Sequence, residues 1–362
     1  MTKLTLSLFS LLAFGSAASA EVAYEFAPNF IQPPPGKETI GNGHGEIAVD
    51  SAGNVYVSVQ EKDAGIQVYG PDGKFIKALP FPPSVHGFVI RKDEGQEYIF
   101  AAVLGEARVF KAKLDGTIVL EIPTASFPAA QRDAVSVETM DNGKKKVVAG
   151  LKKSETPKQI TVQLANGTDE VIEKTKDTKV AGGLKLTNCD IAPNGDIYVV
   201  DGYGKSWIFV FDREGKYKKV FGGPGEPLKL ANAHKIFIDK RFEPARLMIC
   251  DRGHKRMLHT DLDGNLIGVI AENMRNPSSA SFYGDLMCVA EIAGRVSVWD
   301  KNNKMVAELG ANPETTNKPT IAPKDWQQGI VTSPHGITFD NNGNILETEW
   351  NQWGRVLRWN KK

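Results

Sequence analysis

The stretch Ile47–Leu79, "IAVDSAGNVYVSVQEKDAGIQVYGPDGKFIKAL", contains four short apolar runs separated by turns. Apolar and polar residues alternate within the runs, and the turns carry Gly-Asn or Asp-Gly pairs, which favour tight reversals between antiparallel strands. The stretch therefore predicts a four-stranded antiparallel sheet formed by one continuous segment.

The same unit recurs along the chain. Clear copies begin at Ile191 and Phe237, weaker copies begin near Phe88 and Ser281, and a truncated copy begins at Ile337. Repeats of roughly 40 to 45 residues, each forming a four-stranded sheet, are typical of β-propellers. The sequence therefore predicts an all-β fold, a β-propeller of six four-stranded blades.

Three segments complete this organisation. The last copy has sequence for about three strands, so we expect "EVAYEFAP" at residues 21–28 to supply the missing one and close the ring. Residues 127–184 are charged and turn-rich, and they predict an inserted hairpin or a seventh blade, of which we expect the insertion. Residues 311–331, rich in Pro, Thr and Asn, predict a long loop over one face. Residues 21–362 would then form a single domain.

Residues 1–20 have the pattern of an export signal. Lys3 precedes an apolar run that ends in Ala18-Ser19-Ala20, which suits cleavage at about Ala20/Glu21. No later run reaches the roughly 20 apolar residues that a membrane-spanning helix needs. We therefore expect a periplasmic or secreted protein that is not inserted in a membrane.

The charge balance argues against polyanionic partners. Without Lys3 the chain carries 43 basic and 43 acidic side chains, so neither nucleic acid nor an anionic membrane surface is expected to bind it. We expect a monomer that takes a small-molecule or peptide-derived substrate.

The three cysteines, Cys189, Cys250 and Cys288, all lie in apolar, strand-like runs. We interpret them as small buried apolar residues, and pairing of Cys250 with Cys288 is the alternative.

Three histidines share one position in the repeat. His86, His234 and His335 each stand two residues before the leading apolar residue of the first strand, in the second, fourth and sixth units. The first strand of every blade lines the central channel, so these side chains should meet on the axis about 120° apart. A lone histidine at a strand start more often bonds a neighbouring loop, but three in matched positions indicate a metal site.

Three imidazoles with an open fourth position are typical of catalytic zinc. Copper, iron and manganese remain alternatives at such a site. His44 is one position out of register, and we expect it on the rim or beside a ligand. The ends of the second strands should share this face of the ring, namely Asp201-Gly202-Tyr203, Asp251-Arg252, Glu291 and Glu349-Trp350. For Glu291 and Glu349, capping of a turn is an equal alternative.

The segments "APNGDIYVVDGYGKSWIFVFDREGKY", "NAHKIFID", "CDRGHKRM" and "SPHGITFD" resemble peptidyl-α-hydroxyglycine α-amidating lyase and related NHL-type six-bladed propellers. The resemblance runs from about Gly43 to Trp359, apart from residues 127–184. It implies zinc held by the three histidines, Tyr203 as the base that takes a hydroxyl proton, and Arg252 as a nearby stabilising cation. The reaction it implies splits a carbinolamide into an amide and glyoxylate.

Two positions depart from that family. Gln60 stands where the family has an arginine that grips the substrate carboxylate, and an amide cannot replace a bidentate cation. Gly336 replaces the acid after the last histidine, which puts a structural calcium ion in doubt. Gln60 and Glu349 remain the candidate substrate-binding residues.

The sequence thus predicts an exported zinc-dependent lyase acting on a small hydroxylated substrate at the channel mouth. A metal-dependent lactonase or other hydrolase, in which Tyr203 merely orients the substrate, is the second hypothesis. A non-catalytic propeller that binds a ligand or a protein is the third.

Overall fold

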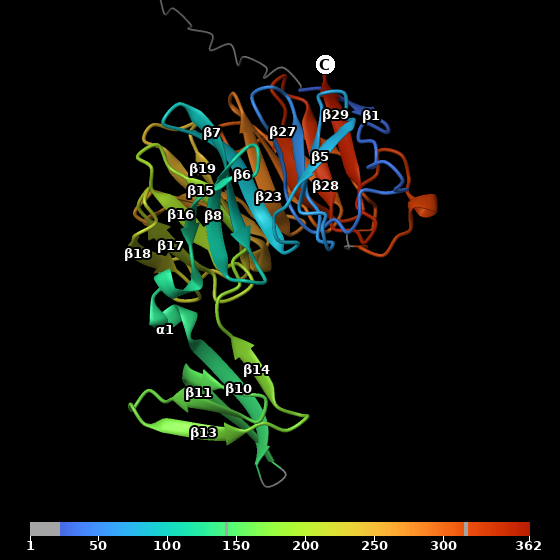
Figure 1. Ribbon diagram of the computed structural model, residues 1–362. Helices are drawn as coiled ribbons and strands as arrows, with labels where there is room; N and C mark the ends of the chain where they lie inside the picture. The colour runs from blue at the N-terminus through green and yellow to red at the C-terminus, as the bar shows by residue number, and fades with distance from the viewer. Residues whose placement is uncertain (1–21, 142–143, 315–317) are drawn as a thin grey trace, which may run out of the picture.

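The computed structural model describes residues 22–141, 144–314 and 318–362. Within this part of the chain, six four-stranded antiparallel sheets form the blades of a propeller, and one five-stranded sheet lies outside the ring (Figure 1). The expected all-β, six-bladed architecture is therefore confirmed.

Each of the first three blades is one meander of consecutive strands. The first blade contains β2 (Ile47–Val49), β3 (Val55–Ser58), β4 (Ile66–Tyr69) and β5 (Phe75–Leu79). The second contains β6 (Val85–Asp93), β7 (Gln96–Val103), β8 (Arg108–Lys113) and β9 (Ile118–Ile122). The third contains β15 (Asn188–Ile191), β16 (Ile197–Val200), β17 (Trp207–Phe211) and β18 (Tyr217–Gly222).

The next two blades repeat this order. The fourth contains β19 (Ala233–Asp239), β20 (Arg246–Asp251), β21 (Arg256–Thr260) and β22 (Leu266–Ala271), with the 3₁₀ turn η2 (Arg252–His254) between β20 and β21. The fifth contains β23 (Pro277–Tyr283), β24 (Leu286–Glu291), β25 (Arg295–Trp299) and β26 (Met305–Leu309).

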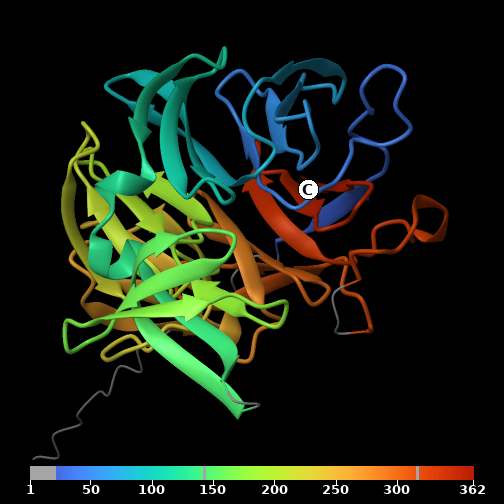
Figure 2. The same ribbon diagram turned by 60° about the horizontal axis from the view of Figure 1, so that its bottom comes forward.

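The sixth blade joins the two ends of the described chain. It contains β27 (Pro334–Phe339), β28 (Ile345–Glu349), β29 (Val356–Lys361) and, as its outer strand, β1 (Tyr24–Ala27). β1 runs antiparallel to β29 with Tyr24 opposite Lys361, and Figure 2 shows this blue strand beside the red ones. The predicted closure by an N-terminal strand is confirmed.

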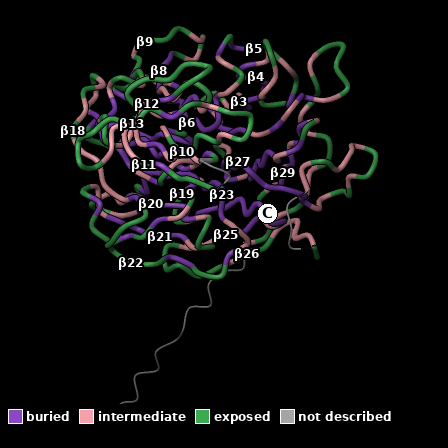
Figure 3. The backbone as a smooth tube through the Cα atoms, turned by 90° about the horizontal axis from the view of Figure 1, so that it is seen from below, coloured by how far each residue is buried: buried purple, intermediate pink, exposed green. Residues whose placement is uncertain are grey.

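The first strands of the blades surround the axis. Contacts link β2, β6, β15, β19, β23 and β27 in that order, and β27 contacts β2 again. Residues at equivalent positions of these strands therefore face one another across the channel. Figure 3 shows the buried residues inside the ring, while outer strands such as β5 and β22 carry exposed residues.

The segment that interrupts the repeats forms a separate sheet. After η1 (Thr124–Ser126) and α1 (Ala129–Arg132), the chain forms a five-stranded sheet that projects from the ring (Figures 1 and 2). Its strands are β10 (Ala134–Asp141), β11 (Lys144–Glu155), β12 (Gln159–Gln163), β13 (Asp169–Glu173) and β14 (Lys179–Gly182). It is larger than the expected hairpin, and it is not a seventh blade, because β6 of the second blade and β15 of the third contact each other directly and leave no place for it in the ring.

Other expectations concern the cysteines and the termini. All three cysteines lie in the described part of the chain, where they are buried and free, so the Cys250–Cys288 pairing is not formed. The expected loop at 311–331 carries the short turn η3 (Pro323–Asp325), and residues 315–317 lie outside the description. The predicted signal peptide lies outside the described residues. Among those that are described, no helix has the length and apolarity to cross a membrane.

Candidate metal centre and cavity at the propeller axis

His86, His234 and His335 lie in β6, β19 and β27, the first strands of alternate blades. Each is the extra residue of a β-bulge, because the pairing with the second strand shifts register on either side of it. A bulge re-aims the side chain that it carries. The bulges thus help turn three fully buried imidazoles toward the axis.

Each of these imidazoles is anchored to the neighbouring blade through Nδ1. The acceptors are backbone carbonyl oxygens at 2.7–2.9 Å: Thr187 for His86, Ser278 for His234 and Gly45 for His335. A carbonyl oxygen can only accept, so Nδ1 carries the proton and Nε2 presents a lone pair. Such an outward hydrogen bond is how metal-ligating histidines are usually oriented.

The three rings converge at a single place. Their centres lie 5.0 Å apart for His86 and His234, 4.9 Å for His86 and His335, and 4.8 Å for His234 and His335. Ligand bonds of ~2.1 Å to a tetrahedral ion would put neighbouring imidazole centres roughly 5 Å apart. The spacing therefore suits a shared ion.

Tyr203 brings its hydroxyl into this cluster. The phenolic oxygen lies 3.2 Å from His86 Nε2, 3.1 Å from His234 Nε2 and 3.3 Å from His44 Nε2. One phenolic proton can satisfy only one of these nitrogens. His335 Nε2, which is buried, has no hydrogen-bond partner among the described residues. This surplus of lone pairs over protons fits a bound cation.

His44 lies closer to the centre than its place out of register suggests. The ligand nitrogens of His44, His86 and His335 lie within 4.8 Å of one another. This set differs from the predicted triad by one member, since it contains His44 in place of His234. The His234 ring nevertheless belongs to the same cluster, with its centre 5.0 Å from that of His86 and 4.8 Å from that of His335.

Gln60 contacts His44 rather than the cavity. Its Oε1 lies 3.2 Å from His44 Nδ1, and it does not line the cavity described below. The structure therefore places this predicted substrate-binding residue against the Nδ1 side of His44, away from the cavity.

A cavity of about 430 Å³ opens above the cluster. Arg252 and Tyr203 line it, and the Arg252 guanidinium carbon lies 5.3 Å from the centre of the Tyr203 ring. Trp350 and His44 also line it and stack on each other, with ring centres 5.2 Å apart. The remaining lining residues are Asn276, Ile292 and Ala293. The predicted pair Tyr203 and Arg252 thus lies together beside the histidines.

Burial decides the protonation state of the four histidines and of Tyr203. It lowers the pKa of His86, His234 and His335 well below the usual value, and neighbouring positive charges act in the same direction. Burial also lowers the pKa of His44 to about 4. The imidazoles are therefore neutral at pH 7, which is the form that binds metals. Burial raises the pKa of Tyr203, although the charge of Arg252 opposes the shift.

The acids that close the second strands support the loops. Glu349 accepts from the backbone N–H of Thr332 and, at 2.7 Å, from its hydroxyl. Glu291 accepts from Arg275 N and is paired with Arg295. Both carboxylates are fully buried and neither lines the cavity. The capping interpretation therefore describes Glu349 better than substrate binding does.

The layer below the histidines holds an internal ion pair. Lys235 Nζ lies 2.8 Å from Glu46 Oε2, and Ser279 Oγ donates to the same oxygen at 2.9 Å. A Cβ on Gly336 would lie 2.5 Å from Glu46 Oε1, so the family's acid could not stand there without displacing this carboxylate. The lysine ammonium supplies the positive charge at this level, which does not suit a calcium ion beside it.

The sequence did not indicate every element of the site. The carbonyl anchors come from the first, third and fifth blades, which have no histidine in the repeat position, and backbone atoms leave no mark in side-chain patterns. His44 was noticed, but its approach depends on the loop path before β2. The bridge between Gly43 and Asn351 holds that loop beside the last blade.

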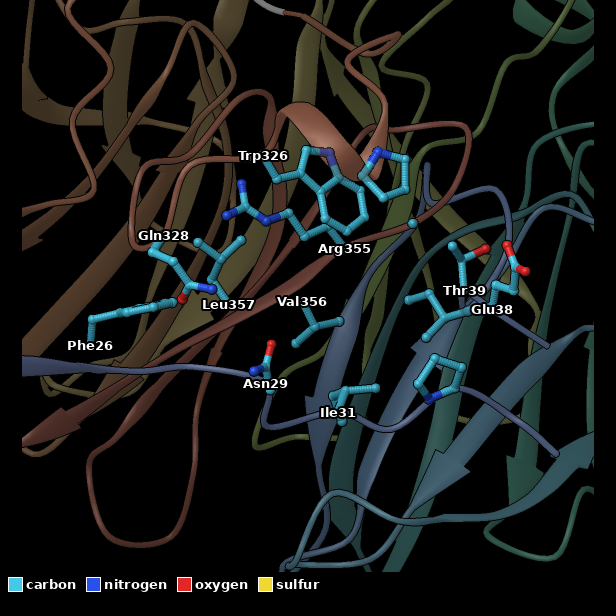
Figure 4. Close-up of a pocket in the computed structure, with 14 residues that line it drawn as sticks. Phe26, Asn29, Ile31, Glu38, Thr39, Trp326, Gln328, Arg355, Val356 and Leu357 are labelled. Carbon is cyan, nitrogen blue, oxygen red and sulfur yellow. The ribbon is translucent and has the colours of Figure 1, made fainter. Parts of the chain in front are cut away.

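A second cavity, of about 280 Å³, lies where the N-terminal segment meets the last blade (Figure 4). Arg355 lies over the Trp326 ring there, 5.2 Å from its centre, among apolar residues such as Phe26 and Val356. Neither the histidine cluster nor Tyr203 lines it. This cavity is therefore separate from the candidate metal site at the axis.

Comparisons with known proteins agree on the fold. A family model described as a 6-bladed beta-propeller matches residues 185–283, and no curated protein matches the sequence. A streptogramin B lyase structure is similar with a TM-score of 0.53 and 14% identity, covering 95% of this chain and 100% of that one. Selenomethionine-substituted virginiamycin B lyase from Staphylococcus aureus has a TM-score of 0.52 and 15% identity, covering 94% of this chain and 99% of that one. At these identities the likeness concerns the β-propeller fold.

Proposed function

We propose that the protein is an exported, metal-dependent lyase that acts on a small hydroxylated substrate in the cavity above the histidine cluster. Zinc is the ion implied by the resemblance to the peptidyl-α-hydroxyglycine α-amidating lyases. His86, His234 and His335 would hold it. Two structural neighbours are lyases by name, but it is the chemistry of the site that carries the proposal.

The observation that supports a metal most directly is the surplus of lone pairs. His86, His234 and His335 use their Nδ1 protons on backbone carbonyls, and their Nε2 atoms face inward. Leaving such buried acceptors unpaired costs about 1–3 kcal/mol each. A divalent cation would satisfy all of them together, and it would supply the Lewis acidity that makes a substrate hydroxyl more acidic.

Tyr203 would then act as the base. Its oxygen is within 3.3 Å of three Nε2 atoms, and its raised pKa keeps the phenol protonated without added positive charge. A cation at the cluster and the Arg252 guanidinium would both favour the phenolate. The phenolate would take the proton of the substrate hydroxyl as the carbon–oxygen bond becomes a carbonyl. The carbon–nitrogen bond would break with its electrons moving to nitrogen, and the Tyr203 phenol would pass that proton on to the nitrogen, which regenerates the phenolate.

The cavity limits the substrate. A volume of about 430 Å³ holds a small molecule or the end of a peptide. The Arg252 side chain lines the cavity beside Asn276, so an anionic or carbonyl group could bind there. Gln60 offers no charge for a carboxylate, which argues for a substrate other than the family's own.

Metal analysis tests the proposal first. The full chain should copurify with, or take up, about one divalent ion per molecule, and His86→Ala or His234→Ala should lose most of that affinity. His254→Ala is the matched control, because His254 is half exposed and paired with Asp251 outside the cluster. A wild-type protein with no affinity for zinc, copper, iron or manganese would instead indicate a propeller that only binds a partner.

Tyr203→Phe distinguishes the lyase hypothesis from the hydrolase hypothesis. A lyase that needs this base should lose ~10²-fold or more in kcat while still binding metal. The raised pKa of Tyr203 favours one alternative, a hydrolase in which the phenol stays protonated and only orients the substrate. In that case the Phe variant should keep most of its activity on lactones or esters.

A further inference from the structure

His44 has the position and orientation of a ligand. Its Nε2 points into the cluster and its ring centre lies 4.7 Å from that of His335 and 5.2 Å from that of His86. These distances are close to the 4.8–5.0 Å spacing among the other three histidines. His44 belongs to the loop before β2, outside the register that places the others, so the repeat pattern does not assign it to the metal.

The outward nitrogen of His44 is anchored as the others are, but by a side chain. Nδ1 faces Gln60 Oε1 at 3.2 Å, and the ring stacks on Trp350 at an interplanar angle of 30°. An amide oxygen can only accept, so Nδ1 carries the proton and Nε2 presents its lone pair to the centre. Gln60 thereby gives His44 the tautomer that the backbone gives His86, His234 and His335.

The Tyr203 oxygen shows how these atoms are spaced. Three nitrogens, those of His44, His86 and His234, lie 3.1–3.3 Å from it. Ligand atoms at right angles around an ion with bonds of ~2.1 Å are about 3 Å apart. His335 Nε2 has no hydrogen-bond partner among the described residues, and the ligand nitrogens of His335, His44 and His86 lie within 4.8 Å of one another.

We propose that His44 is a fourth imidazole ligand of the ion held by His86, His234 and His335, and that Gln60 is its positioning residue. The inference rests on the metal site of the proposed function. Four imidazoles fill every position of a tetrahedral ion, so a substrate oxygen could bind only to an ion that accepts a fifth or sixth ligand. The site therefore suits a divalent transition ion that does so, such as iron, cobalt, manganese or five-coordinate zinc.

The test uses the full chain, stripped of metal and titrated with cobalt(II). The visible absorption of cobalt(II) is weak when the ion has five or six ligands and strong when it is tetrahedral. We expect weak bands for the wild type. His44→Ala should bind ~10- to 100-fold more weakly and shift toward the strong tetrahedral bands. His254→Ala, the control outside the cluster, should match the wild type in both measurements.

Gln60 provides a second test that leaves His44 in place. Gln60→Leu removes the acceptor and should weaken cobalt binding several-fold, whereas Gln60→Glu keeps an acceptor and should restore it. These two Gln60 variants test whether His44 is a ligand even if His44→Ala proves unstable. A positioning role predicts the rescue by Glu, which loss of packing alone does not.

The results distinguish failure of the fourth ligand from failure of the whole metal site. If His44→Ala and Gln60→Leu bind cobalt with wild-type affinity and spectrum while His86→Ala does not, His44 is not a ligand and the proposed metal site stands. If the wild type itself binds no cobalt and no zinc, the fourth ligand and the proposed function both fall.

Discussion

Lys235 Nζ lies 2.8 Å from Glu46 Oε2, and both side chains are buried in the channel directly below the histidines. The two residues come from opposite blades of the ring, the fourth and the first. Breaking a buried pair leaves one charge uncompensated, which typically costs ~3–5 kcal/mol. We therefore expect Lys235→Met to lower the free energy of unfolding by about that amount, as measured by urea denaturation.

The double variant Lys235→Met/Glu46→Gln controls for packing. It removes both charges and keeps an acceptor for the backbone N–H of Ile337, which bonds Glu46 Oε1 at 3.0 Å. Most of the lost stability should return. A double variant as unstable as Lys235→Met alone would show that lysine packing, and not the uncompensated carboxylate, dominates.

Removing the metal should destabilise the whole ring. The histidines lie in three different blades, so an ion at the axis binds only the folded chain. With free metal at 100 times its Kd, binding adds ~2.7 kcal/mol to the free energy of unfolding. We expect EDTA to lower the melting temperature measured by calorimetry, and excess metal to restore it. The His234→Ala variant should show no difference between the two conditions.

The metal-free chain should lose stability in mild acid. His86, His234 and His335 stay neutral when folded because burial lowers their pKa, and His44 does so down to about pH 4. In the unfolded chain they are protonated below about pH 6.5. The unfolded state then binds more protons, so the free energy of unfolding falls as the pH drops from ~6.5 toward 4, by up to ~1.4 kcal/mol per pH unit for each histidine.

His335→Gln checks this slope, because glutamine does not titrate. The variant should lose about 1.4 kcal/mol per pH unit less than the wild type between pH 6 and 4.5. Above pH 7.5 any difference between the two proteins should be independent of pH. Parallel profiles below pH 6 would mean that His335 is protonated in the folded state.

The inserted sheet should be dispensable for the ring. Its apolar cluster, built on residues such as Val137 and Ile160, contains no blade residue. The ends of the insertion lie together, since Gly183 N donates to Ala134 O at 2.9 Å. Replacing residues 135–182 by a short Gly/Ser linker should leave cooperative unfolding and metal affinity near those of the intact chain. Loss of the folded ring, measured by circular dichroism, would contradict this.

The insertion also shows what the sequence could and could not predict. Period-two alternation and turn residues indicated the blades and their order, because each blade is local in sequence. The extent of the extra sheet was missed, since β10 pairs with β14 across about forty residues and weakly amphipathic strands carry little signal.

The site residues likewise fall into those that the repeat pattern predicts and those that depend on the path of a loop. His86, His234 and His335 were found because the repeat converts equal register into proximity. The role of Gln60 could not be found in this way. It depends on the path of the loop that carries His44, which no periodic pattern encodes. Glu349 had the right place along its strand, but its side chain is turned away from the cavity by its hydrogen bonds with the backbone N–H and the hydroxyl of Thr332.

Glu347 carries a pH-dependent cost that a single substitution should remove. Its side chain in β28 is fully buried, and neither carboxylate oxygen has a hydrogen bond of normal geometry among the described residues, although the nearby His335 backbone slightly favours the charge. Burial, reinforced by Glu349, raises its pKa well above 4.5. The unfolded chain releases this proton as the pH rises past 4.5 and the folded chain does not. The free energy of unfolding therefore falls by ~1.4 kcal/mol per pH unit above that point.

Glu347→Gln keeps the shape of the side chain without its ionisation. The stability advantage of this variant over the wild type should therefore grow by about 1–3 kcal/mol between pH 4 and pH 7 in urea denaturation. A constant difference across this range would mean that Glu347 ionises in the folded protein.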